Sequence, residues 1–229
     1  MFWQNANYEW ATKYVYGIEK DYRLVKVGKV GCYLHGDGLA NVILSDGLGN
    51  FVNTKDYKGI LRKEDDNTKD NQQFDIILSN PPYSVSSFKQ TTREFYTEKD
   101  FDLYNCLTDN SSEIECLFVE RTKQLLKDGG IAGVILPSSI LTNTGIYTKT
   151  RELLLKYFEN CCYNRIRLQI HLWQLVTNTV VLFFEKKNNY DCINLQKIQL
   201  YKFFTDKNDV TINNIETPVS KYVSYVWEI

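Results

Sequence analysis

Short apolar runs alternate with amphipathic stretches along most of the 229-residue chain. Apolar runs over residues 15–19, 41–46 and 74–79 predict three strands, and two more are predicted over 131–136 and 180–185. The first run is short and reads as a buried strand. Each of the first three runs ends at a polar side chain or directly before one, so polar groups are expected at several strand ends.

Apolar positions spaced three and four residues apart predict a first helix, which begins after Asp21 and ends at Gly36. The side chain of Asp21 can cap the start of this helix. One face of the helix carries Leu24, Val27, Gly31 and Leu34.

Two further helices are predicted downstream. Ser112 and Glu115 form a capping-box pattern, and the amphipathic stretch behind them is closed by Gly129-Gly130. The second of these helices spans residues 147–158, where apolar side chains again recur at helical spacing.

Three stretches interrupt this alternation. Residues 51–73 are polar and charged, which predicts a solvated loop with one short helix. Residues 84–110 show no clear period, and a loop of that length in a compact domain is usually functional or mobile. Residues 188–229 are polar and contain tyrosines, so we interpret them as the start of another segment.

The alternation of strands and helices indicates an α/β fold with a mostly parallel sheet and helices on both faces. Ligands of such sheets bind beyond the carboxyl ends of the strands. Glu19, Asp46 and Asn80 are predicted at those ends. The sequence therefore predicts a nucleoside-binding crevice at this edge of the sheet.

Composition narrows the class of protein. Hydrophobic residues make up 43% of the chain and charged residues 24%, which is typical of a globular protein of one domain with a short extension. The net charge is -1, whereas a protein that holds a nucleic-acid backbone on its own is usually basic. Any DNA binding must therefore depend on a local patch or on a partner.

The six cysteines predict free, buried thiols in a reducing cytosol rather than a metal site. No two of them form a Cys-x-x-Cys pair, and only His35 and His171 could complete a metal site. His35 is interpreted as a structural residue that closes the first helix. We find no signal peptide and no apolar run long enough to span a bilayer, so we expect a cytoplasmic protein with no metal and no membrane contact.

The most informative element is Asn80-Pro81-Pro82-Tyr83, which directly follows the strand predicted over 74–79. An exocyclic aromatic amine is a poor nucleophile, because its lone pair is delocalised into the ring. The Asn80 side-chain carbonyl and the Pro81 backbone carbonyl can accept its two N–H groups, and the prolines hold both acceptors in place. Tyr83 offers a flat face on which an extruded base can stack. The alternative is a Pro-Pro turn that only stops a strand.

Glu19 and Asp46 are the candidate cofactor ligands. An acid at the end of the second strand of a Rossmann-like unit accepts hydrogen bonds from ribose hydroxyls, which is the role expected of Glu19. Asp46 could accept a hydrogen bond from the adenine amine of a cofactor. The alternatives are a surface acid near a helix start for Glu19 and an Asp-Gly turn for Asp46.

Six elements, taken in order, match the pattern of one known family. They are Gly17-Ile18-Glu19, Tyr33-Leu34-His35-Gly36, Ser45-Asp46-Gly47-Leu48, Phe74-Asp75 with Asn80-Pro81-Pro82-Tyr83-Ser84, Gly129-Gly130 with Val134-Ile135-Leu136-Pro137, and Thr177-Asn178-Thr179. Over residues 15–187 the chain resembles N6-adenine DNA methyltransferases. The nearest resemblance is to modification subunits of type I restriction systems and to the related fused type IIG enzymes.

This resemblance implies a Rossmann-like class I methyltransferase sheet, S-adenosyl-L-methionine as the cofactor, and an adenine flipped from double-stranded DNA as the substrate. Glu19 would contact the cofactor ribose, Asp46 its adenine, and Asn80, Pro81, Pro82 and Tyr83 the target base, with Asn80 also near the cofactor. Residues 84–110 would close over the flipped nucleotide.

The same resemblance implies a domain organisation and partners. Residues 1–187 would be a partial catalytic domain, and residues 188–229 the start of a linker toward a recognition region. In this family a specificity subunit or a separate recognition domain reads the DNA sequence, and a restriction subunit is a further expected partner, in a bacterial cytoplasm.

The chain departs from the family in two places. The glycine-rich cofactor loop and its strand, expected just before Glu19, have no counterpart, since residues 1–14 contain no glycine. We therefore expect the sheet to lack its first strand and the chain to be a fragment. Residues 164–176 do not show the family's Phe followed by Thr-Gly-Thr, which a local frameshift would explain. Both departures are typical of a decaying gene or a misassembled reading frame.

Two other functions remain open on the sequence. A protein-glutamine or ribosomal-RNA methyltransferase can share the Asn-Pro-Pro-Tyr turn, although the surrounding elements fit less well. A non-catalytic remnant that binds partner subunits is the third reading, and weak binding of S-adenosyl-L-methionine would favour it.

Overall fold

A computed structural model describes residues 9–35, 41–52, 54–57, 61, 71–92, 96–166, 179–187, 210–212 and 215–217. The chain divides into two compact units. The first unit comprises residues 1–71 and 92–101, and the second comprises residues 72–91 and 102–229. Each unit has its own strands and helices.

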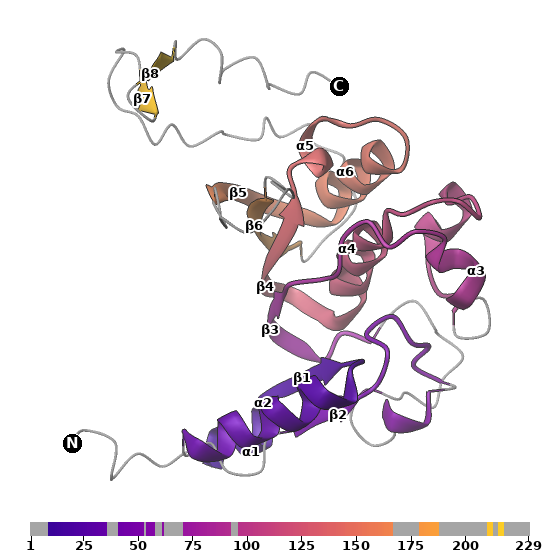
Figure 1. Ribbon diagram of the computed structural model, residues 1–229, viewed down its shortest axis with the longest axis vertical. Helices are drawn as coiled ribbons and strands as arrows, with labels where there is room; N and C mark the ends of the chain where they lie inside the picture. The colour runs from indigo at the N-terminus through magenta and orange to yellow at the C-terminus, as the bar shows by residue number, and fades with distance from the viewer. Residues whose placement is uncertain are drawn as a thin grey trace. The chain divides into compact units, whose positions relative to one another are not determined.

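The first unit contains two parallel strands, β1 and β2, with the helix α2 between them in the chain (Figure 1). Its elements are α1 (Glu9–Tyr14), β1 (Tyr16–Glu19), α2 (Tyr22–Leu34), β2 (Asn41–Leu44) and η1 (Lys55–Tyr57). The register pairs Gly17 with Val42 and Glu19 with Leu44. Both predicted strands are confirmed, although β1 is half-buried along its length rather than buried.

The helix α2 begins as the sequence predicts. The side chain of Asp21 accepts hydrogen bonds from the backbone N–H groups of Arg23 and Leu24, which satisfies two donors of the first turn. The helix ends at Leu34 with His35 as its C-cap, and the expected terminator, Gly36, lies outside the described residues. The predicted apolar face carries exposed side chains, while Val25 is buried.

The stretch after β2 is not the solvated loop that its charges predict. Phe51, Tyr57 and Leu61 are buried, whereas the charged residues Lys55 and Asp56 of η1 are exposed. The aromatic residues contribute apolar area that the unit buries, and the charges stay in water beside them. The expected short helix is present as η1, and residues 58–60 and 62–70 lie outside the described part of the chain.

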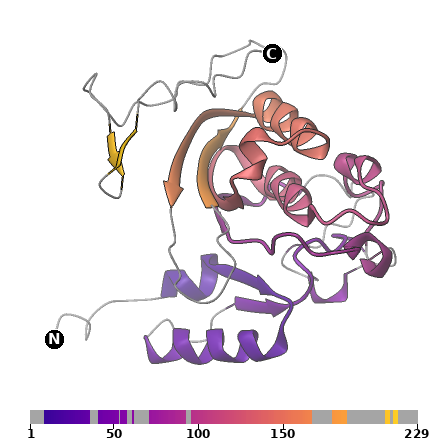
Figure 2. The same cartoon turned by 45° about the horizontal axis from the view of Figure 1, so that its top comes forward.

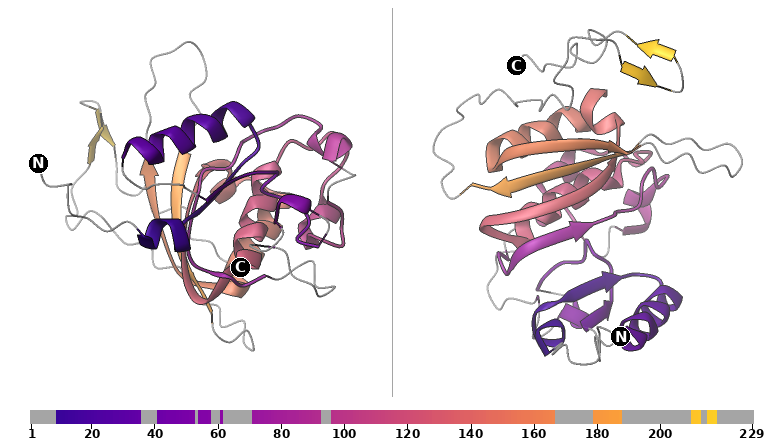
Figure 3. Two further views of the ribbon diagram at one scale, coloured as in Figure 1. Left: turned by 90° about the horizontal axis from the view of Figure 1, so that it is seen from below. Right: turned by 90° about the vertical axis from the view of Figure 1, so that its left-hand side faces the viewer.

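The second unit is built on a four-stranded sheet with the strand order β3-β4-β6-β5, which the right-hand view of Figure 3 shows. Its strands are β3 (Phe74–Ser79), β4 (Leu126–Pro137), β5 (Phe158–Ile166) and β6 (Thr179–Lys186). Its helices are α3 (Phe88–Thr92), η2 (Asp102–Cys106), α4 (Ile114–Leu125), α5 (Ser139–Thr142) and α6 (Ile146–Tyr157). A hairpin of β7 (Val210–Ile212) and β8 (Ile215–Thr217) follows.

The sheet of the second unit is mixed, and not mostly parallel as the sequence predicts. β3 runs parallel to β4, whereas β6 runs antiparallel to both β4 and β5. β5 and β6 lie side by side in Figure 2. β5 is absent from the sequence-based prediction, which ended a helix at residue 158 and treated residues 164–176 as scrambled. Residues 167–178 lie outside the described part, so the frameshift hypothesis stays a prediction.

The helices α4 and α6 cover one face of this sheet (Figure 1). The core between them contains fully or almost fully buried apolar side chains, among them Leu117, Val119, Ala132, Val134, Leu136, Leu154 and Leu182. The opposite face carries Ile76, Leu78, Ile131 and Phe183, which are exposed. Its register aligns Leu78, Gly133 and Phe183 in one row across three strands.

The strands β1 and β3 belong to separate sheets in the described part of the chain, and each has one hydrogen-bonded neighbour there.

Gly129-Gly130 lies inside the observed strand β4 and not at the helix end that the sequence predicts, since α4 ends at Leu125 and β4 begins at Leu126. Gly129 has a φ of +74°, a conformation that side chains disfavour. A Cβ atom on Gly130 would lie 2.8 Å from Leu126 Cγ and 2.9 Å from the carbonyl oxygen of Lys127. The glycine pair therefore permits a close backbone approach at the start of the strand.

The segment over residues 84–110 contains two short helices that its irregular pattern does not predict, α3 and η2. The start of η2 is held by Glu120 of α4, a buried carboxylate that accepts hydrogen bonds from the N–H groups of Asp102 (2.7 Å) and Leu103 (2.9 Å). A contact of this kind has no local sequence pattern.

The core of the second unit can be tested by cavity formation. Leu117→Ala removes a fully buried side chain of α4 and should lower the free energy of unfolding by about 2–5 kcal/mol. Urea unfolding followed by circular dichroism measures the change. The control is Leu78→Ala, which truncates a side chain that is 80% exposed and should change the free energy by no more than about 0.5 kcal/mol. Equal effects would contradict the assignment of the two faces.

Candidate active site

The Asn80–Tyr83 turn begins where the parallel pairing of β3 and β4 ends. The last pair in the register is Ser79 with Val134, so Asn80 leaves the sheet at the carboxyl end of β3, as predicted. Asn80 and Pro82 are exposed, Pro81 is buried and Tyr83 is half-buried. The turn is therefore anchored by its first proline and presents the Asn80 side chain to solvent.

Two side chains of the turn contact each other. The Tyr83 hydroxyl donates a hydrogen bond of 3.0 Å to Asn80 Oδ1. The carbonyl that the sequence assigns to an incoming amine is thus occupied by an internal donor. Because the contact is exposed to water, a ligand amine can replace it at low cost.

The backbone beyond the turn adopts conformations that are rare for residues with side chains. Ser84 has a φ of +52° and Ser87 a φ of +53°. Left-handed conformations of this kind persist when surrounding contacts hold them. For Ser84 that contact is known, because its backbone N–H donates to Glu115 Oε2 at 3.3 Å.

The capping box predicted from Ser112 and Glu115 is wrong. The N-cap of α4 is Glu113, and its side chain makes no capping hydrogen bond to the helix. Glu115 cannot reach back to Ser112, because it is fully buried and its two carboxylate oxygens accept hydrogen bonds from Ser84 N–H and from the Tyr147 hydroxyl (2.7 Å). Glu113 Oε2 accepts the Ser112 N–H instead, at 2.9 Å.

The two candidate cofactor ligands lie in the first unit. Glu19 is the last residue of β1 and Asp46 follows β2, and the Ser45 N–H donates to the Glu19 carbonyl, so both acids stand at the same edge of this sheet. Glu19 Oε1 accepts the Asp21 N–H at 2.8 Å. Two carboxylates at neighbouring strand ends provide the acceptors that hydroxyl and amine donors of a nucleoside need.

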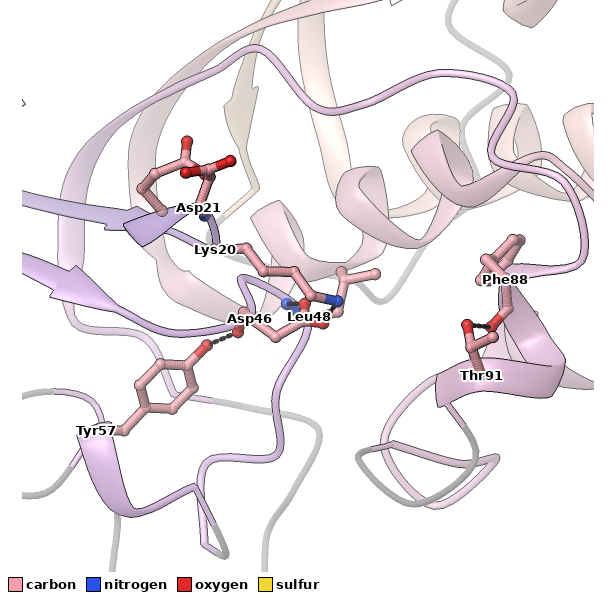
Figure 4. A network of polar contacts seen from close by, with 8 residues as sticks. Lys20, Asp21, Asp46, Leu48, Tyr57, Phe88 and Thr91 are labelled. Atoms are coloured by element: carbon pink, nitrogen blue, oxygen red, sulfur yellow. Dashed lines mark hydrogen bonds and ion pairs between the residues drawn. The ribbon is translucent and has the colours of Figure 1, made fainter. Parts of the chain in front are cut away.

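Asp46 is part of a tight turn as well (Figure 4). Its Oδ1 accepts the Leu48 N–H at 3.0 Å, its backbone carbonyl accepts the Gly49 N–H and the Tyr57 hydroxyl, and its Oδ2 pairs with Lys20 at 2.8 Å. The Asp-Gly turn considered in the sequence is therefore present. The hydrogen bonds of this turn hold Asp46 in place. Its ion pair with Lys20 is the contact that a ligand would displace, since the Lys20 side chain is mostly exposed.

The predicted site residues thus form two groups, one in each unit. Glu19 and Asp46 come together in the first unit, and Asn80, Pro81, Pro82 and Tyr83 come together in the second. Glu115 and Tyr147 are polar residues beside the turn that the sequence did not assign to the site. An acid in the first turn of a helix and a tyrosine on another helix give no local signal of a shared contact.

The second unit also has a polar hollow of about 450 Å³ beside Tyr147. The segment between α5 and α6, the start of α6, and Glu113 contribute to its lining. Its volume lies within the usual range for small-ligand sites. Tyr147 both lines this hollow and donates to Glu115, which in turn accepts from the residue that follows Tyr83.

Other predicted features concern cysteines, metals and membranes. Cys116 is buried as expected, and this burial raises the pKa of its thiol to about 12. Cys32 is half-buried and Cys106 is exposed, so the prediction of buried thiols is wrong for these two residues. No group of three or more potential metal ligands occurs in the described part. Likewise, none of the described helices is both long and apolar enough to span a membrane.

The fold belongs to a known class of enzymes. A Listeria monocytogenes protein assigned to the class I S-adenosylmethionine-dependent methyltransferases matches 78% of this chain with a TM-score of 0.55 and 17% identity, over 46% of its own length. A type I restriction-modification methyltransferase subunit from Streptococcus thermophilus matches 76% of the chain with a TM-score of 0.53 and 20% identity, over 34% of its length. The chain therefore has the Rossmann-like α/β fold of class I methyltransferases, as predicted.

Sequence comparison gives the family. Residues 13–168 match the model of the Eco57I restriction-modification methylase, and the chain belongs to this family. It is 27% identical over 94% of its length to the type II restriction enzyme and methyltransferase RM.Eco57I of Escherichia coli. It is 31% identical over half of its length to the type I restriction enzyme EcoEI methylase subunit of Escherichia coli. The chain spans 23% and 21% of these two relatives.

The protonation of Tyr83 can be tested by alkaline titration. Burial raises the pKa of Tyr83 above its ordinary value of 10.0, and the charge of Glu115 raises it further, so the hydroxyl remains a donor to Asn80 at neutral pH. The pKa of Tyr83 is higher in the folded state than in the unfolded state. The contribution of the protonated Tyr83 hydroxyl to the free energy of unfolding is therefore present below pH 10 and is lost as the pH rises through the folded-state pKa.

The absorbance of the wild type and of Tyr83→Phe is recorded as a function of pH, and the second curve is subtracted from the first. We expect the difference to show one phenol that ionises above pH 10. In Glu115→Gln this ionisation should move to lower pH but stay above 10, because burial is the larger cause. A difference curve with its midpoint at or below pH 10 would contradict the placement of Tyr83.

Proposed function

We propose that this chain is the catalytic part of an adenine-specific DNA methyltransferase of a restriction-modification system. The observation that carries the proposal is the Asn80–Tyr83 turn, which stands at the carboxyl end of β3 with an exposed side-chain carbonyl and an adjoining aromatic ring. Membership of a methylase family supports the reaction type. The methyl group would pass from S-adenosyl-L-methionine to the N6 amine of an adenine flipped from double-stranded DNA.

The turn supports this reaction by accepting hydrogen bonds. Asn80 Oδ1 and the Pro81 carbonyl would each accept one N–H of the target amine, which draws its lone pair out of conjugation with the ring. The amine takes the place of the Tyr83 hydroxyl at Asn80 Oδ1, and Tyr83 is then left to stack on the base. Pro81 and Pro82 keep the acceptors fixed through their restricted φ angles.

The residues of the first unit fit a nucleoside cofactor. Glu19 would accept hydrogen bonds from ribose hydroxyls, and Asp46 would accept from the adenine amine after its Lys20 pair opens. S-adenosyl-L-methionine supplies an electrophilic methyl group when bound. Asn80 would border both the cofactor and the target base.

The remaining parts of the proposal concern the whole protein. Residues 1–187 would form the partial catalytic domain, and residues 188–229 would lead toward a recognition region. A specificity subunit or recognition domain, a restriction subunit and double-stranded DNA are the proposed partners, in the bacterial cytoplasm. The net charge of -1 supports a partner that supplies much of the DNA contact.

The substrate class can be tested by methyl transfer. The chain, alone and with its partner subunits, is incubated with tritiated S-adenosyl-L-methionine and with plasmid DNA, release factor or ribosomes. We expect label in DNA, and we expect Asn80→Ala to lower kcat by about 10²- to 10³-fold, because one pre-organised acceptor is lost. The exposed Glu152→Ala on α6 serves as the control and should retain wild-type activity.

Label in release factor or ribosomes would favour a protein-glutamine or ribosomal-RNA methyltransferase. No transfer to any substrate, in the presence of partner subunits, would favour a non-catalytic remnant. Either result would reject the proposed DNA substrate.

The two functions of Tyr83 can be separated by substitution. Tyr83→Phe removes the hydrogen bond to Asn80 but keeps the ring, so it should retain most of the activity. Tyr83→Ala removes the stacking surface as well and should weaken binding of a flipped base by about 1–3 kcal/mol. Fluorescence of 2-aminopurine at the target position measures the flipped state. Equal losses in both variants would argue against stacking on Tyr83.

A further inference from the structure

We infer that Glu115 is a positioning residue that holds the Asn80–Tyr83 turn through the backbone N–H of Ser84, with Tyr147 fixing the carboxylate from the other side. This inference rests on the proposed function, since it concerns how the turn is kept in its active geometry. All the residues involved lie in the second unit.

The contact acts on the peptide group directly after Tyr83. Glu115 Oε2 accepts the Ser84 N–H at 3.3 Å, and this N–H belongs to the peptide that joins Tyr83 to Ser84. The orientation of this peptide group fixes the backbone at Tyr83, and therefore the direction in which the Tyr83 side chain leaves the backbone. Ser84 stands in the left-handed region, so without an anchor the chain could relax to a more common conformation.

The carboxylate itself is held firmly. Glu115 is fully buried, and its Oε1 accepts the hydroxyl of Tyr147 at 2.7 Å. Burial raises the pKa of Tyr147, so the hydroxyl stays protonated and remains a donor at neutral pH. A buried carboxylate is costly unless its oxygens are hydrogen-bonded, and here both oxygens have a donor. Its place in the first turn of α4 adds the favourable field of a helix N-terminus.

Three elements thus meet at one side chain. Glu115 comes from α4, Tyr147 from α6, and Ser84 from the segment after β3. The two helices pack on the same face of the sheet, so the rigid core of the unit extends to the peptide beside the turn. Such support is what a pre-organised acceptor pair requires, because small displacements of reacting groups are costly for the rate.

Two substitutions of Glu115 distinguish its role as a hydrogen-bond acceptor from a role that only fills space in the core. Glu115→Gln keeps a carbonyl that can accept the Ser84 N–H, and its amide can donate to a rotated Tyr147 hydroxyl. Glu115→Met keeps a similar volume but has no acceptor for the Ser84 N–H. Glu120→Gln is the matched control, since Glu120 is a second buried carboxylate of α4 whose two backbone donors lie in η2.

The first readout is hydrogen exchange at the Ser84 amide, followed by NMR on the full chain. We expect this amide to be protected in the wild type, in Glu115→Gln and in Glu120→Gln, and to lose its protection in Glu115→Met. Fast exchange of the Ser84 amide in the wild type, or equal protection in wild type and Glu115→Met, would overturn the inference. Where Glu115→Met does not fold, fast exchange in the wild type would still overturn the inference, and the comparison of Glu115→Gln with the wild type would still test it.

The second readout is kinetic and uses the same methyl-transfer assay. For Glu115→Met we expect kcat to fall by about 10²-fold and the KM for S-adenosyl-L-methionine to change much less, because the turn is misplaced while Glu19 and Asp46 of the first unit are intact. Glu115→Gln should restore most of kcat. A rise in KM at constant kcat would contradict the positioning role. Absence of methyl transfer by the wild type would reject the proposed function, whereas the amide exchange would still decide on the anchor.

Discussion

The parallel pairing of β3 with β4 is the constraint on which the candidate site depends. It ends at the pair of Ser79 and Val134, so the chain must leave the sheet at Asn80 and turn along its carboxyl edge. Two prolines make that turn stiff, and the buried Pro81 fastens it to the unit. The Asn80 carbonyl is consequently presented to solvent at a fixed place, which is the property that a site for activating an amine needs.

The support of the turn comes from the interior of the unit rather than from the turn itself. A buried carboxylate on α4 receives one hydrogen bond from α6 and one from the peptide after Tyr83. A neighbouring carboxylate, Glu120, holds the start of η2 in the same manner. Helix α4 therefore has two roles, since its apolar side chains fill the core and its two buried acids hold the peptide after Tyr83 and the start of η2.

Much of this organisation could be predicted from the sequence, and the exceptions have physical causes. The strand ends at Glu19 and Ser79 and the capping by Asp21 are local features, set by periodicity and by short-range hydrogen bonds. The role of Glu115 is not local, because its partners lie 31 and 32 residues away and its spacing from Ser112 imitates a capping box. Burial of Phe51 and Tyr57 was missed because polar and charged residues surround them in the sequence. The strand β5 was missed because polar residues such as Asn160, Asn164 and Arg165 interrupt any apolar run over Phe158–Ile166.

The chemical identity of the methylated atom tests the central claim most directly. Plasmid DNA treated with the protein, its partner subunits and S-adenosyl-L-methionine would be digested to nucleosides and analysed by mass spectrometry. An amine held between the Asn80 and Pro81 carbonyls predicts N6-methyladenine in the wild-type reaction and a loss of this nucleoside with Asn80→Ala. Methylation of a ring carbon, or N6-methyladenine at equal yield from both proteins, would contradict the account.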